Sequence, residues 1–424
     1  MKKVKAVLIG AGDRGAKAYA PYSINFPHEL EFVAIAEPVQ ERRKSFAKEF
    51  SLSDTQCYTS WEEMLDHNIK ADVALICTLD REHYLPTVRA IEKGYHVLLE
   101  KPMSPDPKEC ISMVEVAKKH NKLLTICHVL RYTPFWQNIK SIIDEGKIGD
   151  IVSIQLNENV EVMHMSHSFV RGNWNNSDIS SPMILQKSCH DMDILMYLMN
   201  QKCKQISSFG SLMHFKEENA PKDGPLRCLD GCPIENECVF HAGKYYLGDG
   251  RGWAKKFTTD HSRAGIIHAL NTTPYGKCVY RSDNNVVDHQ VVNLEFENGA
   301  TATFSMCGFT REQTRIVQIM GTKGEIRGKM DDNTISVFDF LTKNETVTHL
   351  AEQASGHGGG DEAIVRDFLQ EVRNYQGEES KTSAVVSLES HLLAFAAELS
   401  RLQDGKVIQI ANFSNEALNG EGVV

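Results

Sequence analysis

Hydrophobic residues in the first third of the chain fall in short unbroken runs, separated by longer amphipathic stretches. The runs are rich in Val, Ile and Leu and lie at 4–9, 32–36, 73–77, 97–99 and 123–126. Short apolar runs that alternate with helical periodicity are typical of parallel βαβ units, in which helices cover both faces of the sheet. The pattern therefore predicts a doubly wound α/β domain over residues 1–129.

The remaining chain, residues 130–424, shows longer strands in which apolar and polar positions alternate. Asn298-Gly299 joins two of them and is a strong hairpin dipeptide. Further strands are expected at 315–320, 324–327 and 334–340, with one long helix at 181–199 and two closing helices at 362–374 and 386–403. The pattern predicts an α+β domain with a large, mostly antiparallel open sheet.

Residues 214–269 follow neither pattern and are interpreted as an insertion rich in Gly, Pro, charged residues and cysteine. Few apolar residues are available there, which favours a stabilising device such as a metal. Three cysteines and a histidine predict a structural zinc site there, with the ligands Cys228, Cys232, Cys238 and His241. An iron–sulfur site would need Cys203 or Cys278 as a further ligand, and reduced free thiols are the other alternative.

Composition narrows the class of protein. The 424 residues include 42% hydrophobic and 24% charged residues, as in ordinary globular enzymes, and the net charge of -10 argues against binding to nucleic acid or anionic membranes. The chain contains no run of about 18 apolar residues, which is the length needed to span a bilayer. Eleven scattered cysteines suit reduced thiols, and the N-terminus lacks a complete signal peptide, so a cytoplasmic location is expected.

The first predicted strand leads directly into Gly10-Ala11-Gly12-Asp13-Arg14-Gly15, which opens a helix. In this context the glycines allow a tight turn and a close approach of the backbone to a pyrophosphate, which the helix N-terminus also favours. Gly10, Gly12, Asp13, Arg14 and Gly15 are therefore predicted to bind a dinucleotide in a Rossmann domain.

Glu37 ends the second strand, where a carboxylate accepts hydrogen bonds from both hydroxyls of the adenosine ribose. The carboxylate would repel a 2′-phosphate, so NAD is favoured over NADP. Arg42 and Arg43 follow on the next helix and could soften this preference.

A second motif, Glu100-Lys101-Pro102, ends the fourth strand. With the glycine motif, Arg131-Tyr132 and the segment 187–193, it resembles the Gfo/Idh/MocA family of oxidoreductases. The resemblance implies that Thr78, His83, Glu100 and Lys101 border the cofactor, and that Arg131 and Tyr132 lie on the substrate side. It also implies a homodimer or homotetramer.

In that family, the lysine of this motif and a histidine on a helix of the second domain serve the reaction, and they correspond to Lys101 and His190. Hydride transfer at an alcohol carbon also moves a proton at its oxygen, which an imidazole can accept. Lys187 and Asp193 lie one helical turn away on either side of His190, and Asp193 is expected to orient its ring. Many relatives carry an aspartate where this chain has Gln186, which cannot titrate.

Polar and aromatic side chains before the long helix are expected to hold a polyhydroxylated ring, although a plain loop is the alternative. They are Arg171, Asn173 and Trp174, with His164, His167 and His357 as further candidates, and Gln186 as a residue that can bind a hydroxyl.

The favoured function is an NAD-dependent oxidoreductase that acts on a secondary alcohol of a sugar, inositol or related polyol. Two alternatives stay open: a glycosidase that works by transient oxidation and elimination with bound NAD, and a non-catalytic NAD sensor. The presence of both Lys101 and His190 argues against the sensor.

Overall fold

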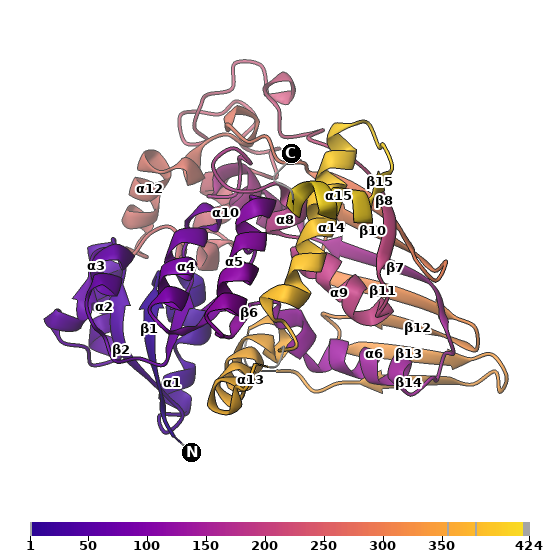
Figure 1. Cartoon of the computed structure of the whole chain (residues 1–424). Helices are drawn as coiled ribbons and strands as arrows, with labels where there is room; N and C mark the ends of the chain where they lie inside the picture. Colours follow the sequence, from indigo (N-terminus) through magenta and orange to yellow (C-terminus); the bar gives the residue numbers. More distant parts are fainter. Residues whose placement is uncertain (1, 354–355, 378–379, 419–424) are drawn as a thin grey trace.

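The computed structural model describes residues 2–353, 356–377 and 380–418, and it contains two β-sheets side by side (Figure 1). All neighbouring strands of the N-terminal sheet are parallel, in the order β3-β2-β1-β4-β5-β6. Its strands are β1 Val4–Ile9, β2 Leu30–Ala36, β3 Cys57–Tyr58, β4 Val73–Ile76, β5 His96–Leu99 and β6 Leu124–Ile126. The predicted doubly wound domain is confirmed.

Helices follow these strands and cover the sheet on both faces (Figure 1). They are η1 Asp13–Tyr19, which is a π-helix, α1 Tyr22–Asn25, α2 Gln40–Glu49, α3 Trp61–Asp66, α4 Tyr84–Glu92 and α5 Pro107–Lys119. The start of α5 is encoded locally: the Asp106 side chain accepts a hydrogen bond from the Lys108 N–H, and Pro107 occupies the first turn, where no N–H is needed.

The second sheet has nine strands in the order β14-β13-β12-β11-β7-β10-β9-β8-β15. Within the described part of this sheet only β7 and β10 pair in parallel, which confirms the mostly antiparallel sheet. The strands are β7 Ile151–Asn159, β8 Cys203–Ser211, β9 His289–Phe296, β10 Thr301–Cys307, β11 Thr314–Gly321, β12 Gly324–Lys329, β13 Thr334–Asp339, β14 Glu345–His349 and β15 Ile408–Gln409. The predicted hairpin turns at Gly299, whose φ of 86° suits glycine.

Helices α6 Pro134–Asp144, α9 Cys189–Met199 and α14 Ala384–Leu402 lie between the large sheet and the N-terminal domain (Figure 1). The single helix expected over 181–199 is wrong, because the chain forms α8 Met183–Gln186 and then α9, with a break at Lys187 and Ser188. Within an unbroken helix the Gln186 carbonyl would accept the N–H of residue 190. At the break it binds a lysine of the other domain instead.

After the large sheet the chain returns to the N-terminal domain. Helix α13 Gly360–Asn374 buries Ile364, Val365, Phe368 and Leu369 in the same hydrophobic cluster as β1 and β2. The N–H of Ile126 in β6 then donates to the Thr382 carbonyl at 2.8 Å. The last described elements are α14, β15 and α15 Ile410–Leu418. The described helices include none that is long and apolar enough to span a membrane.

The insertion contains α10 Ala242–Leu247, α11 Arg251–Ala254 and α12 Arg263–Thr272. The expectation that it has little to bury is wrong. It has a small core of its own around Tyr246, Ile266 and Leu270, against which Trp253 and Phe257 pack. The aromatic residues supply much of this apolar area because each ring is large.

Candidate active site

The glycine-rich loop between β1 and η1 has the geometry that a dinucleotide site needs. Gly10 has a φ of 90°, and a Cβ there would lie 2.6 Å from the Cys77 carbonyl oxygen. A Cβ at Gly15 would lie 2.2 Å from the Gly10 carbonyl oxygen, so this glycine lets the helix approach the loop. Gly12 faces open space, with no described atom within 4 Å of a Cβ placed there. The loop thus leaves room for a pyrophosphate beside Gly12.

Glu37 lies at the end of β2, as predicted, and is buried. Its carboxylate accepts hydrogen bonds from the N–H groups of Ala11 at 2.7 Å and Val39 at 2.9 Å. These two contacts use one lone-pair direction on each oxygen, and each oxygen can accept a second donor such as a ribose hydroxyl. The Arg43 guanidinium donates to the backbone carbonyls of Glu37 and Pro38, so this arginine lies beside Glu37.

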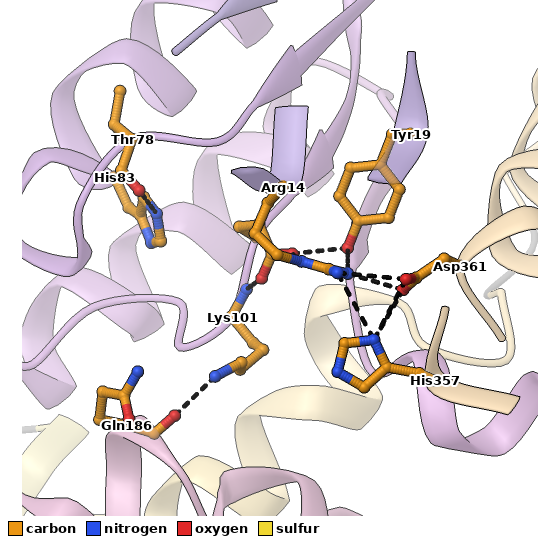
Figure 2. Close-up of polar contacts among 9 residues, drawn as sticks. Arg14, Tyr19, Thr78, His83, Lys101, Gln186, His357 and Asp361 are labelled. Atoms are coloured by element: carbon orange, nitrogen blue, oxygen red, sulfur yellow. Dashed lines mark hydrogen bonds and ion pairs between the residues drawn. The ribbon is translucent and has the colours of Figure 1, made fainter. Parts of the chain in front are cut away.

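Arg14 points toward Asp361 and so joins η1 to α13 (Figure 2). Its Nε donates to Glu100 Oε1 at 2.5 Å, and its Nη2 donates to Asp361 Oδ1 at 2.7 Å and to the Tyr19 hydroxyl at 2.5 Å. Burial opposes both charges, but the Arg14 guanidinium helps to hold the pKa of Glu100 and of Asp361 below the usual range. The Arg14 guanidinium is therefore engaged in an ion-pair network that supports the loop, and its contact with the cofactor stays a prediction.

Lys101 reaches across the domain interface. Its Nζ donates to the backbone carbonyl of Gln186, at the end of α8, at 2.6 Å (Figure 2). The loop after it is held by His83, whose Nδ1 lies 2.7 Å from the Pro102 carbonyl oxygen and whose Nε2 lies 3.2 Å from that of Thr78. The Thr78 hydroxyl donates to the Glu82 carbonyl, which shapes the same turn. Lys101 thus has one strong partner and stays at the edge where the two domains meet.

His190 lies on α9 at this interface and is only 6% exposed. Its ring centroid is 5.7 Å from that of His128 and 6.2 Å from that of His357. Burial, followed by the charge of Lys101, lowers the pKa of His190 well below its usual value, so the ring is neutral at neutral pH. Its Nδ1 has no hydrogen-bond partner among the described residues. A neutral imidazole with an unsatisfied nitrogen suits a hydroxyl-bearing ligand.

The expected contact between Asp193 and His190 is not formed. Asp193 binds Arg131 in a bidentate ion pair, with Oδ2 to Nε and Oδ1 to Nη2 both at 2.7 Å, and both side chains are buried. Arg131 also donates to the Lys381 carbonyl. Asp193, one turn after His190 on α9, therefore faces η4 Val129–Tyr132. Arg131 was predicted to contact the substrate, and its guanidinium forms this structural ion pair.

Lys187 also turns away from His190, because the helix break lies between them. Its Nζ is 3.0 Å from Glu158 on β7. The other oxygen of Glu158 lies 2.8 Å from Arg315 Nη2, and Arg315 Nε donates to Asp191 at 2.6 Å. Burial raises the pKa of Asp191 to about 6, against the opposing effect of Arg315. Two cations and two carboxylates alternate in this chain, which balances their charges within the buried site.

Three of the predicted substrate residues are occupied by structural contacts. The Tyr132 hydroxyl lies 3.1 Å from the Thr382 hydroxyl in a buried position. The Trp174 indole N–H donates to Asp80 at 3.4 Å. Arg171 Nε and Nη2 donate to the carbonyls of Lys277 and Phe240, both at 2.7 Å, so this arginine supports the insertion.

The other three remain available. Asn173 is exposed, and the Oε1 atom of Gln186 is buried without a described partner. His357 stands at the interface, with Nδ1 3.1 Å from Asp361 (Figure 2). Gln186 and His357 lie near Lys101 and His190 respectively, which makes them the better candidates for substrate contacts.

The insertion reaches the glycine-rich loop. Lys256 Nζ lies 3.7 Å from the Asp13 carboxylate and 4.4 Å from the centroid of the Trp253 ring. That ring packs against His164 and His167, at centroid distances of 5.1 and 4.7 Å. Asp13 is therefore bound by Lys17 and Lys256. The Trp253 ring of the insertion packs beside His164 and His167, and these three rings are called the aromatic wall below.

The predicted zinc set is wrong. Both ring nitrogens of His241 are used, since Nδ1 accepts the Lys244 N–H at 3.2 Å and caps α10, while Nε2 lies 2.8 Å from the Cys228 carbonyl oxygen. Within the described ranges, no three His, Cys, Asp or Glu side chains converge as ligands of one ion. The spacing of residues along the chain could not reveal that the imidazole serves as a helix cap.

Other supporting residues were missed by sequence reasoning. His391 on α14 accepts the Met103 N–H at 2.9 Å and its Nδ1 lies 2.7 Å from the Ser387 carbonyl, so it holds the loop that carries Lys101. Burial lowers the pKa of His391 to about 3. A histidine within a long apolar helix was its only signal in the sequence.

Comparison with known proteins agrees with this architecture. Residues 4–128 match the domain described as "Oxidoreductase family, NAD-binding Rossmann fold", and residues 140–397 match "Oxidoreductase family, C-terminal alpha/beta domain". Together these matches span most of the chain. The protein belongs to the Gfo/Idh/MocA family of oxidoreductases.

Individual relatives are distant. YteT of Bacillus subtilis, named as an oxidoreductase, is 24% identical over 71% of this chain and 72% of its own. D-glucoside 3-dehydrogenase of Escherichia coli is 28% identical over 35% of this chain and 41% of its own. The fold is also that of levoglucosan dehydrogenase in complex with NADH and L-sorbose, with a TM-score of 0.71 at 18% identity, over 97% of this chain and 99% of that one.

Proposed function

We propose that this protein transfers a hydride between NAD and a secondary alcohol of a sugar, inositol or related polyol. The observation that carries the proposal is that Lys101 and His190, which belong to different domains, border the same interface. Lys101 brings a charged hydrogen-bond donor, and His190 brings a neutral ring whose Nδ1 has no described partner. Similarity to dehydrogenases named for glucoside and levoglucosan supports the substrate class.

The residues present fit the dinucleotide. The open space at Gly12 would take the pyrophosphate and the second lone pairs of Glu37 would take the ribose hydroxyls. When bound, NAD supplies the hydride acceptor or donor. Glu37 favours NAD over NADP, because its carboxylate would repel a 2′-phosphate, although Arg43 lies close enough to moderate the repulsion.

The side chains of the site move the proton, stabilise charge and bind the substrate. His190 accepts the proton of the reacting hydroxyl when the alcohol is oxidised, and returns it in the reverse direction. The Lys101 ammonium donates a hydrogen bond to the same oxygen and stabilises the negative charge that develops there. Gln186 and His357 bind neighbouring hydroxyls and fix which carbon reacts.

A second candidate is an NAD-dependent glycosidase that oxidises one ring carbon, eliminates the neighbouring glycosidic bond and then returns the hydride. The observation that favours it is Gln186, a neutral residue with a buried, unsatisfied Oε1 where many relatives carry an aspartate. Such a site would handle a transient ketone without releasing it.

The deciding experiment is a screen of the purified full chain with NAD against sugars, inositols, sugar acids and aryl glycosides, with NADH absorbance and aglycone release followed together. NADH formation that is lost in Lys101→Met and His190→Asn supports the dehydrogenase. Aglycone release without net NADH supports the glycosidase. Tight NAD binding with silence in both channels would overturn both proposals and favour the sensor.

A further inference from the structure

Three cysteines of the insertion and Cys278, which follows it in the chain, line one small cavity. Cys228 and Cys278 are buried, Cys232 and Cys238 are half-buried, and the same cavity is bordered by Arg171. Cys228, Cys232 and Cys238 come from one loop, whereas Cys278 follows α12, 40 positions after Cys238. The fold therefore gathers a thiol from a distant segment onto the three that the sequence already groups.

Arg171 gives an independent indication that the cavity receives an anionic group. The arginine is 2% exposed and forms no ion pair with any described carboxylate. Its Nη1 is buried and has no acceptor in the described part of the chain, and its Nη2 lies 3.7 Å from Cys228 Sγ. A buried guanidinium without a counter-charge is costly, and thiolates that bind a metal centre would supply that charge.

The arrangement differs from a site for a single ion. A mononuclear tetrahedral centre needs its ligands to converge on one point, and no three such side chains among the described residues do so. In an iron–sulfur cluster with four irons, each thiolate binds a different iron, so the ligands surround the cavity at a greater distance from one another. Such a cluster with its thiolates is anionic, and the buried Nη1 of Arg171 would donate a hydrogen bond to it.

We propose that Cys228, Cys232 and Cys238 of the insertion, together with Cys278, bind a four-iron iron–sulfur cluster. Four cysteine ligands are the usual set for such a cluster. The cluster would tie the loop before α10 to the segment after α12. Because Arg171 ends η5 Met165–Arg171, which also carries His167, the cluster would brace the aromatic wall beside the glycine-rich loop. This inference concerns the insertion and does not depend on the proposed reaction.

The test is metal analysis of the full chain, produced with added iron and purified without oxygen. We expect about four iron and four acid-labile sulfide per chain, a broad absorption band in the visible region and an EPR signal after reduction by dithionite. Reconstitution of metal-free protein with ferrous iron and sulfide should restore the band. A well-folded protein that holds only zinc, or no metal even after reconstitution, would overturn the proposal.

Variants separate the four ligands from other thiols. Cys278→Ser and Cys232→Ser should each lose most of the iron and the visible band. The matched control is Cys203→Ser, since Cys203 is a buried cysteine on β8 that does not border the cavity, and it should keep both. If the ligand variants fold poorly, the iron and sulfide content of the unsubstituted protein still decides the matter. Iron retained in a folded Cys278→Ser variant would contradict the assigned ligand set.

Discussion

The Nζ atom of Lys101 lies 2.6 Å from the backbone carbonyl oxygen of Gln186, and this hydrogen bond crosses the interface between the domains. It exists because α8 ends at Gln186 and leaves that carbonyl without a helical partner. The same break turns Lys187 toward Glu158. A single interruption in one helix therefore positions the candidate catalytic lysine and keeps a second lysine away from it.

Replacement of Lys101 tests its role directly. We expect Lys101→Met to lower kcat by about 10²- to 10³-fold, because the donor to the developing oxyanion is lost. The dissociation constant of NAD, measured by calorimetry, should change by less than about threefold. Lys101→Arg should restore little activity, since the planar guanidinium cannot take the position of the compact ammonium. An unchanged kcat in Lys101→Met would exclude the proposed role.

The pH dependence of oxidation tests His190. The base is active when neutral, and its pKa in the folded protein is below the usual value, so the active form persists as the pH falls. A histidine with the ordinary pKa of about 6.5 would leave about a quarter of the plateau kcat/KM at pH 6. We expect kcat/KM to stay near its plateau there and to fall only at lower pH.

The same assignment predicts that His190→Asn loses about 10²- to 10⁴-fold in kcat. Circular dichroism at each pH should accompany the profile, so that unfolding is not mistaken for titration. An acid limb centred at pH 6.5 or above would contradict the position of His190 in this environment.

Variants of Arg131 and Asp193 test whether Arg131 stabilises the fold or binds the substrate. Arg131→Met leaves a buried carboxylate uncompensated and should lower the free energy of unfolding by about 3–5 kcal/mol. The double variant Arg131→Met/Asp193→Leu should recover much of that loss, because no buried charge is left alone. Urea denaturation of the three proteins measures this. A KM for substrate that rises more than about tenfold in folded Arg131→Met, with stability unchanged, would instead support the substrate contact expected from the sequence.

The fold could be predicted from the sequence because its signals are local. Apolar runs such as Val4–Ile9 and the Asn298-Gly299 hairpin each specify an element with little help from distant residues. The break at Lys187 and Ser188 could not be predicted in this way, since Lys187 is compatible with helix and the Gln186 carbonyl finds its partner, Lys101, in the other domain. Aromatic spacing in the insertion also gave no periodic signal, although those rings form a core.

The site residues that local motifs position could also be predicted, whereas partners brought in by tertiary packing could not. The glycine-rich loop and Glu37 lie where the motifs place them, because one βα unit fixes both. The partners of Asp193 and Arg14 could not be predicted, because Arg131 and Asp361 are brought to them by tertiary packing over long stretches of chain. Helical spacing correctly placed Asp193 one turn from His190, but a stronger partner on η4 decides where its carboxylate points.

Cofactor preference provides the last test. Glu37→Gln removes the negative charge that receives ribose hydroxyls, and hydrogen bonds to a charged acceptor contribute about 1.5–3 kcal/mol. We therefore expect NAD to bind about 10- to 100-fold more weakly, while NADP loses less or gains, because the repulsion of its 2′-phosphate disappears. Calorimetric titration with each cofactor measures the ratio, and Glu41→Gln on the exposed part of α2 is the matched control. If Glu37→Gln leaves the ratio of the two affinities unchanged, the carboxylate does not select the cofactor, and the selection must lie with Arg43 or another residue.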